Sequence, residues 1–166
     1  MALVSSSQIV TDQSATPIVK VNSLEKGGVS RHAQGYIAAA SMTGGTTGQW
    51  YTFVRLPVRA RIIGIELTNL TTTTGAVKCG LYRPDGIAID DDVFATNVAT
   101  TARTAARIDT VQTALERSRD IATAYATAIG TASATSDVEV DIALAIVTVI
   151  GTPVDVFLDV EYVLPE

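Results

Sequence analysis

The sequence predicts an all-β protein, an antiparallel β-sandwich of the jelly-roll or Greek-key kind with an extended N-terminal arm and one short helix. Residues 137–146 and 154–163 each alternate apolar with polar or small side chains, which is the period of half-buried antiparallel strands. Turn signatures separate several further short apolar runs, as in sandwiches. A chain of 166 residues, 47% of them hydrophobic, can bury a core of its own as one domain.

Residues 1–34 form the expected arm, and residues 35–166 form the expected sandwich domain. The arm is rich in Ser, Thr, Gln and Gly, and its apolar patches are short, as in PIVKV at 17–21. A terminal segment that has apolar patches but no core of its own is usually held down by another surface. That surface would belong to its own sandwich or to a neighbouring subunit.

The first expected strand covers residues 35–40. The loop that follows contains TGGTTG at 43–48, which lacks the lysine of a phosphate-binding loop and precedes no helix, so we expect a flexible connection. Pro57 ends the next expected strand, residues 50–56, whose predicted core face is Trp50, Thr52, Val54 and Leu56.

Residues 60–70 and 76–82 form the next two expected strands, with the turn TTTTG between them. The predicted core face of the first consists of Ile63, Ile65 and Leu67. In the second, Cys79 shares a face with Val77 and Leu81, which predicts a small buried hydrophobe rather than a reactive thiol. The sequence RPDG at 83–86 predicts a tight turn, because proline presets φ at the first central position and Asp and Gly suit the following ones.

The two alternating segments near the C-terminus are separated by the short sequence IGTP at 150–153, which predicts that they pair as a hairpin. Residues 114–130 break the strand pattern. They contain helix-forming residues and end at a glycine, which predicts one helix serving as a crossover or as a lid on the sandwich.

The residues that could support catalysis are few. The chain has one histidine, His32, and one cysteine, Cys79, whereas a zinc site needs several such ligands. His32 could formally serve a Ser-His-Asp triad, but no G-x-S-x-G nucleophile elbow is present and His32 lies in the expected arm. We therefore expect no enzyme activity, no catalytic residue and no cofactor.

The densest acidic cluster is Asp90, Asp91 and Asp92, with Asp85 upstream. Consecutive residues of a strand point to opposite faces, and no glutamate follows at the spacing of a calcium loop. The expected role is a solvated turn or interface charge. An opportunistic cation site and a two-carboxylate hydrolase stay open as alternatives.

Charge and hydropathy exclude further classes of partner. The net charge of −5 disfavours nucleic-acid binding, which needs a basic surface. The basic run RLPVRAR, with Arg55, Arg59 and Arg61, is expected to be a turn with solvated arginines, the alternative being an interface ion pair. The longest apolar run, residues 142–151, is about half a membrane span. The N-terminal residues lack a signal-peptide pattern, so we expect synthesis in a cytoplasm.

Three stretches carry a resemblance to a known family: GQWYTFVRLPVRARIIGIEL at 48–67, GAVKCGLYRPDGIAIDDDVFAT at 75–96 and VDVFLDVEYV at 154–163. They resemble a family of small virion proteins of tailed bacteriophages, and residues 15–31 look like the extended N-terminal part of that family. The chain departs from the family pattern around residues 121–129, where relatives carry an aromatic-containing short helix.

The resemblance implies a capsid decoration, or cement, protein. Similar proteins form sandwich subunits that sit as dimers or trimers outside the shell, where capsomers meet. The implied partners are the major capsid protein and further copies of the chain, and the implied location is the virion exterior. The alternative is a tail or head-fibre component that binds glycans on the host surface, since sandwich folds serve many functions. An enzyme is the third and weakest hypothesis.

Overall fold

The computed structural model describes residues 29–38, 46–70, 74–100, 104–110, 121, 139–151 and 155–164. This part of the chain is built almost entirely from β-strands. Their bounds are β1 Ser30–Ile37, β2 Trp50–Pro57, β3 Arg61–Asn69, β4 Ala76–Tyr82, β5 Ala88–Ala99, β6 Thr104–Arg107, β7 Glu139–Thr148 and β8 Val156–Val163.

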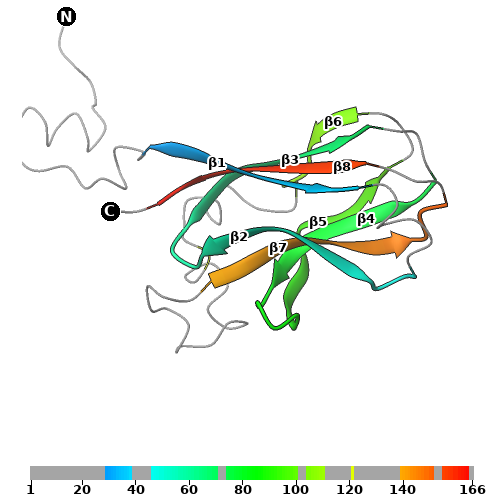
Figure 1. Ribbon diagram of the computed structural model, residues 1–166, viewed down its shortest axis with the longest axis horizontal. Helices are drawn as coiled ribbons and strands as arrows, with labels where there is room; N and C mark the ends of the chain where they lie inside the picture. The colour runs from blue at the N-terminus through cyan, green and yellow to red at the C-terminus, as the bar shows by residue number, and fades with distance from the viewer. Residues whose placement is uncertain are drawn as a thin grey trace, which may run out of the picture.

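The strands form two four-stranded antiparallel sheets, one in the order β1-β8-β3-β6 and the other in the order β2-β7-β4-β5. Figure 1 shows them as two layers, one above the other. Strands from the start and the end of the chain alternate within each layer, which is the arrangement of a jelly roll. The predicted all-β sandwich is therefore confirmed.

The predicted hairpin between the last two strands is wrong. β7 lies between β2 and β4, whereas β8 lies between β1 and β3 in the other sheet. The two sheets of a sandwich are about 10 Å apart, a distance that a connection of several residues spans easily. Periodicity identified core positions in both of these strands, but it carries no information on which strands pair.

Two β-bulges change the predicted core faces of β2 and β3. In β2 the register shifts between Thr52 and Val54, so Val54 and Leu56 are buried while Thr52 is exposed. In β3 it shifts between Ile62 and Gly64, so Ile62 rather than Ile63 joins the core beside Ile65 and Leu67. Each bulge adds one residue to its strand and reverses the alternation beyond it.

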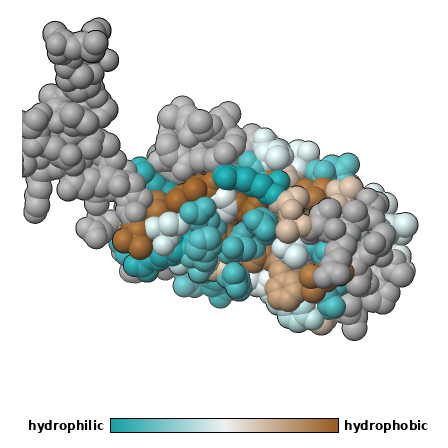
Figure 2. All heavy atoms as spheres, turned by 90° about the horizontal axis from the view of Figure 1, so that it is seen from above, coloured by the Kyte–Doolittle hydropathy of each residue, from teal (hydrophilic) through white to brown (hydrophobic). Residues whose placement is uncertain are grey.

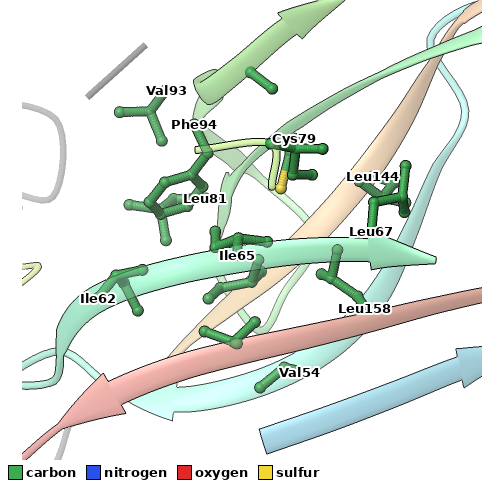
Figure 3. Packing of buried hydrophobic residues seen from close by; sticks show 14 of the residues in the cluster. Val54, Ile62, Ile65, Leu67, Cys79, Leu81, Val93, Phe94, Leu144 and Leu158 are labelled. Atoms are coloured by element: carbon green, nitrogen blue, oxygen red, sulfur yellow. The ribbon is translucent and has the colours of Figure 1, made fainter. Parts of the chain in front are cut away.

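The core lies between the two layers. Figure 3 shows Ile65 and Leu158 from one sheet and Leu81, Phe94 and Leu144 from the other meeting there. Fully burying side chains of this size stabilises the fold by about 1.5–3 kcal/mol each. Cys79 is also fully buried, as predicted, and desolvation raises the pKa of its thiol.

The first strand begins at Ser30, so the boundary expected between residues 34 and 35 falls inside β1. Residues 1–28 of the expected arm lie outside the described residues. The helix expected over 114–130 also lies outside them, apart from the buried Ile121, whose N–H donates to the carbonyl of Ala60 at 3.0 Å. Within the described part of the chain, no helix has the length and hydropathy of a membrane span.

Candidate interaction surface

The outward-facing side of the β1-β8-β3-β6 sheet carries His32 together with polar residues that the sequence analysis did not single out, and we call it the outer face. Because Val156, Leu158 and Val160 of β8 are buried in the core, the residues between them point away from it. Figure 2 views the molecule from above this layer and shows hydrophilic side chains gathered over its middle. The members of the outer face are Ser30, His32, Gln34 and Tyr36 of β1, Gly64, Glu66 and Thr68 of β3, Arg107 of β6, and Phe157, Asp159 and Glu161 of β8.

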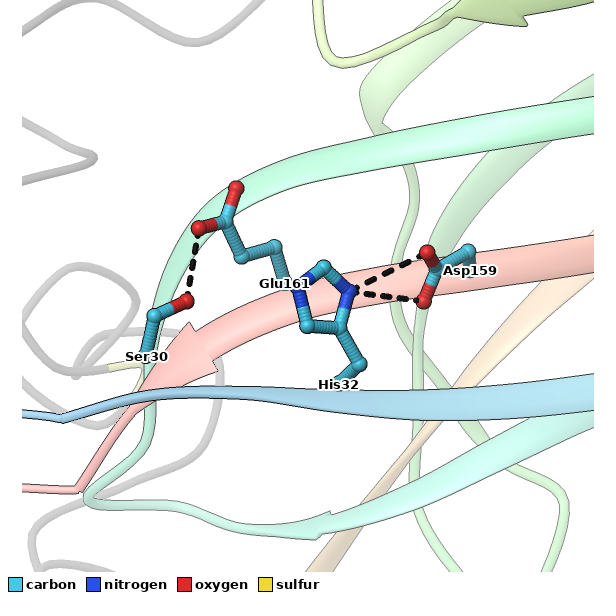
Figure 4. Close-up of polar contacts among 4 residues, drawn as sticks. All are labelled: Ser30, His32, Asp159 and Glu161. Atoms are coloured by element: carbon cyan, nitrogen blue, oxygen red, sulfur yellow. Dashed lines mark hydrogen bonds and ion pairs between the residues drawn. The ribbon is translucent and has the colours of Figure 1, made fainter.

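His32 lies in β1, two strand positions from Ser30, and faces β8. Its Nδ1 atom is 3.1 and 3.2 Å from the two carboxylate oxygens of Asp159 (Figure 4). The Ser30 hydroxyl donates to Glu161 at 2.6 Å rather than to His32. The strand pair β1–β8 thus carries a serine, a histidine and an aspartate, the residue types of a catalytic triad. They do not form a triad, because Ser30 and His32 each bond to a different acidic residue on an open surface, where 55% of the His32 side chain is exposed.

An aromatic pair stands at the other end of the same two strands. Tyr36 and Phe157 are direct cross-strand neighbours, with ring centroids 4.6 Å apart and ring planes 34° apart. They are 53% and 40% exposed. The Tyr36 hydroxyl donates to Asp155 at 2.8 Å, and this hydrogen bond is the main cause of the raised pKa of Tyr36.

Two hollows lie between the polar and aromatic ends of the outer face. The smaller has a volume of about 100 Å³ and is lined by residues that include His32, Glu66, Arg107 and Glu161. The larger, which we call the β3–β8 groove, has a volume of about 350 Å³. Its lining is Gln34, Glu66, Thr68, Leu70, Phe157, Leu158 and Asp159.

Arg107 closes one side of the outer face. Its Nε and Nη2 atoms donate to the two oxygens of Asp109 at 2.7 and 2.9 Å, and Nη2 also donates to the carbonyl of Ile63. Asp109 is buried, and its hydrogen bond is the main cause of the raised pKa of Arg107. The Arg107 guanidinium is therefore held by the carboxylate of Asp109, although Glu66 is the cross-strand neighbour of Arg107.

The opposite sheet presents a different outward surface. Trp50 stacks on Tyr82 with centroids 5.1 Å and planes 20° apart, and the small residues Ala143 and Ala145 of that sheet are buried. Beside them, Arg55 donates to both oxygens of the buried Asp141, at 2.6 and 3.0 Å. The expected turn is present at residues 58 and 59, and Arg55 is exposed as expected, but it also forms an ion pair with Asp141 within the chain.

The acidic cluster lies in strand β5 and not in a turn, which corrects the sequence expectation. The tight turn predicted from RPDG is present just upstream, with Gly86 at a φ of 91°. β5 is an edge strand with an irregular register against β4, and Lys78 pairs with Asp91 across it. Desolvation is the main cause that raises the pKa of Asp90. Within the described residues, no group of three or more His, Cys, Asp or Glu side chains could hold a metal ion.

Sequence reasoning placed His32 in the arm and missed the outer face, because cross-strand pairs join residues that are more than a hundred positions apart. One sequence signal for the outer face was the alternation of inward-facing and outward-facing residues in β8. Once Val156, Leu158 and Val160 are assigned to the core, the residues between them must face outward.

Comparison with known proteins gives a fold but no family. No protein-family model matches the sequence, and no curated protein matches it either. Among solved structures, the chain is similar to chains in the capsid of Ralstonia phage GP4 (TM-score 0.54, 12% identity, covering 84% of this chain and 86% of that chain) and in the cyanophage Pam1 capsid asymmetric unit (TM-score 0.52, 16% identity, covering 83% and 86%).

A third similar structure is the acidic stable capsid of Helicobacter pylori bacteriophage KHP30, with a TM-score of 0.50, 15% identity, and 84% of this chain and 90% of that chain covered. Each match spans a large share of both chains, so the matched chains are similar in length to this one. The chain therefore shares its fold, over most of its length, with chains found in three phage capsid structures.

Proposed function

We propose that this chain is a structural protein of a tailed-phage virion, a decoration or cement protein that binds the outside of the capsid and stabilises contacts between capsomers. The observation that carries the proposal is the near end-to-end fold similarity to chains of three phage capsid structures. The sequence resemblance of residues 48–67 and 75–96 to small virion proteins points the same way.

The side chains that could act in catalysis support a structural role over an enzymatic one. The Cys79 thiol is fully buried and has a raised pKa, so it is a poor source of the thiolate that a nucleophile needs. His32 pairs with Asp159 on an open surface, without the enclosed, preorganised surroundings of a general base. A rigid sandwich with broad faces is what a protein that works through its interfaces requires.

The proposed partners are the major capsid protein and further copies of this chain, as a dimer or a trimer. The proposed location is the capsid exterior, after synthesis in the cytoplasm of the bacterial host. The net charge of −5 is compatible with an outer position, because an acidic protein does not compete for the packaged DNA.

The arm is proposed to extend onto a neighbouring subunit. β1, which follows it directly, is an edge strand of its sheet, and a segment of another chain can bind at such an edge. Removal of residues 1–28 leaves β1–β8 intact, because β1, the first of the described strands, begins at Ser30. We expect the truncated protein to unfold at the same temperature as the full chain, but to bind more weakly to capsids stripped of this protein.

Co-sedimentation with such capsids measures the binding, and thermal unfolding followed by circular dichroism is the control. If the truncated and full-length chains co-sediment equally well at the same Tm, the arm has no role in attachment.

A second candidate function is glycan binding by a tail or head-fibre component. It is favoured by the exposed rings of Tyr36 and Phe157 beside the β3–β8 groove, because sugar sites combine aromatic surfaces with polar groups. A reproducible hit on a glycan array, abolished by Phe157→Ala, is the result that would bring this candidate to the front.

A further inference from the structure

We propose that the outer face is a docking surface for a protein partner that presents an arginine side chain, and that this arginine enters the β3–β8 groove between Glu66, Asp159 and the ring of Phe157. The inference deepens the proposed function, on which it rests for the identity of the partner as a capsid protein. The chemistry of the groove itself is independent of that identity.

The first argument is the facing pair of carboxylates. Glu66 of β3 and Asp159 of β8 are direct cross-strand partners, and both line the groove. Like charges that face each other across a strand pair destabilise a sheet. Among the described residues, the Asp159 carboxylate pairs with the exposed His32, and no side chain forms an ion pair with Glu66. A cation placed between the two carboxylates would turn this repulsion into attraction.

Within the described residues, the arginine that faces Glu66 across the strands does not supply that cation. Arg107 lies opposite Glu66 across β3 and β6, but it is held by both oxygens of the buried Asp109 and by the carbonyl of Ile63. Moving Arg107 into the groove would leave Asp109 buried without this partner, which is strongly destabilising in typical proteins. Among the described residues no cation therefore bridges Glu66 and Asp159, and the arginine of a partner would supply that charge.

The second argument is the aromatic wall. Phe157 lines the groove with 40% of its surface exposed, and Tyr36 packs on it with its hydroxyl held by Asp155. A cation over such a ring is attracted to its π-face, and the attraction grows as the cation is desolvated. An arginine suits the site better than a lysine, because its planar guanidinium stacks on a ring while donating to a carboxylate with two N–H groups.

The exposed aromatic rings beside the carboxylates indicate that the outer face binds a protein rather than a free ion. The exposed rings of Tyr36 and Phe157 offer apolar contact area beside the carboxylates, in the pattern of an aromatic anchor next to charged groups that protein interfaces use. The described residues include no three-ligand set for a metal ion. The carboxylates would repel a nucleic acid.

A titration of the full chain tests the groove directly. The isotope-labelled protein is titrated with the probe peptide acetyl-Gly-Arg-Gly-amide, and backbone amide shifts are followed by NMR. We expect saturable shifts confined to residues of β1, β3 and β8 around the groove, and none with acetyl-Gly-Gln-Gly-amide. Glu66→Gln and Asp159→Asn should each weaken binding roughly tenfold, since a hydrogen bond to a charged group is lost.

Two further variants separate the contributions. Phe157→Leu keeps an apolar side chain but removes the ring, and should weaken binding several-fold. Glu139→Gln removes one negative charge from the other sheet and should leave binding unchanged. The Tm of each variant shows whether its fold is retained. Because each groove carboxylate is replaced in a separate variant, the test still works if one of the two variants misfolds.

The inference is overturned if the arginine peptide produces no shifts at its solubility limit, if the glutamine peptide produces the same shifts, or if Glu66→Gln and Asp159→Asn bind like the unmodified chain. Equal shifts with maltose would assign the groove to sugars instead. Self-association in sedimentation runs that Glu66→Gln abolishes would assign it to a second copy. A chain that is abundant on capsids but fails the titration would refute only this inference.

Discussion

Two arginine–aspartate pairs, one on each sheet, use the same arrangement at the scale of single residues. In both, a partly exposed guanidinium donates two hydrogen bonds to a buried carboxylate, Arg55 to Asp141 and Arg107 to Asp109. A buried carboxylate is tolerated only when it is paired and hydrogen-bonded. The sequence shows Asp141 as a polar position of an expected strand, but it does not show that Asp141 or Asp109 is buried.

The replacement Arg55→Met tests this arrangement. It preserves the apolar stem of the side chain but leaves the buried Asp141 without its ion pair. We expect the Tm to fall by roughly 4–8 °C, because an unpaired buried charge is costly and a chain of this length loses a few degrees per kcal/mol. The exposed Arg59 is the matched control, and Arg59→Met should change the Tm little. Equal changes in Tm for the two replacements would show that the ion pair with Asp141 does not stabilise the protein.

Asp90 gives a pH-dependent prediction. Its folded-state pKa is raised, mainly by desolvation and further by Asp92 and Asp91. A carboxyl group with a raised folded pKa stabilises the protein below its unfolded pKa, and this contribution is lost as pH rises through the folded pKa. Asp90→Asn retains the oxygen that accepts from the N–H of Asp92 but cannot ionise.

We therefore expect Asp90→Asn to be more stable than the unmodified chain at neutral pH, by roughly a few tenths of a kcal/mol because the site is partly solvated. The difference should vanish as the pH falls below the ordinary aspartate range. Denaturant unfolding across this pH range measures it. A variant that is less stable at neutral pH, or a gain that persists in acid, would mean that ionised Asp90 is not strained.

At the scale of strands, bulges account for most of what sequence periodicity could not predict. The predicted core residues of β7 are buried, but Asp141, Ala143 and Ala145 between them are buried too, so β7 is covered on both faces. β8 alternates as predicted from Val156 to Val160. The predicted faces of β2 and β3 hold after the shifts at residues 52–54 and 62–64 but fail before them, because the extra residue reverses the alternation. A bulge depends on the partner strand, so local pattern alone does not reveal it.

Gly80 shows how closely the irregular pairing of β4 and β5 brings two backbones together. A Cβ atom at Gly80 would lie 2.3 Å from the carbonyl oxygen of Asp90 and 2.3 Å from the carbonyl carbon of Asp91. Backbone atoms cannot give way as a side chain can, so Gly80→Ala should lower the free energy of unfolding by about 1–3 kcal/mol or more.

Gly64→Ala is the comparison for Gly80→Ala, because its Cβ would meet only the guanidinium of Arg107, at 3.1 Å, and a side-chain end can shift. We expect a clearly smaller loss of stability. Urea unfolding measures the free energy of unfolding of both variants. A Gly80→Ala protein as stable as Gly64→Ala would show that β5 moves freely away from β4.

At the scale of the whole molecule, the fold class could be predicted from the sequence, whereas the outer face could not. Alternation and turn residues are local signals, and they suffice for a sandwich. The outer face joins β1 to β8 through pairs such as His32 with Asp159, which are 127 positions apart. Such pairs follow from the jelly-roll strand order, which places the first and last strands side by side.

The proposed role, a structural protein that covers a phage capsid, makes a prediction about the abundance of this chain in virions. The most direct measurement is its copy number in purified virions, by quantitative mass spectrometry against the main shell protein. A decoration protein that binds wherever capsomers meet should be present in numbers comparable to those of the shell protein. A copy number far below that of the shell protein would contradict the claim, and would place the chain at a tail or a single vertex.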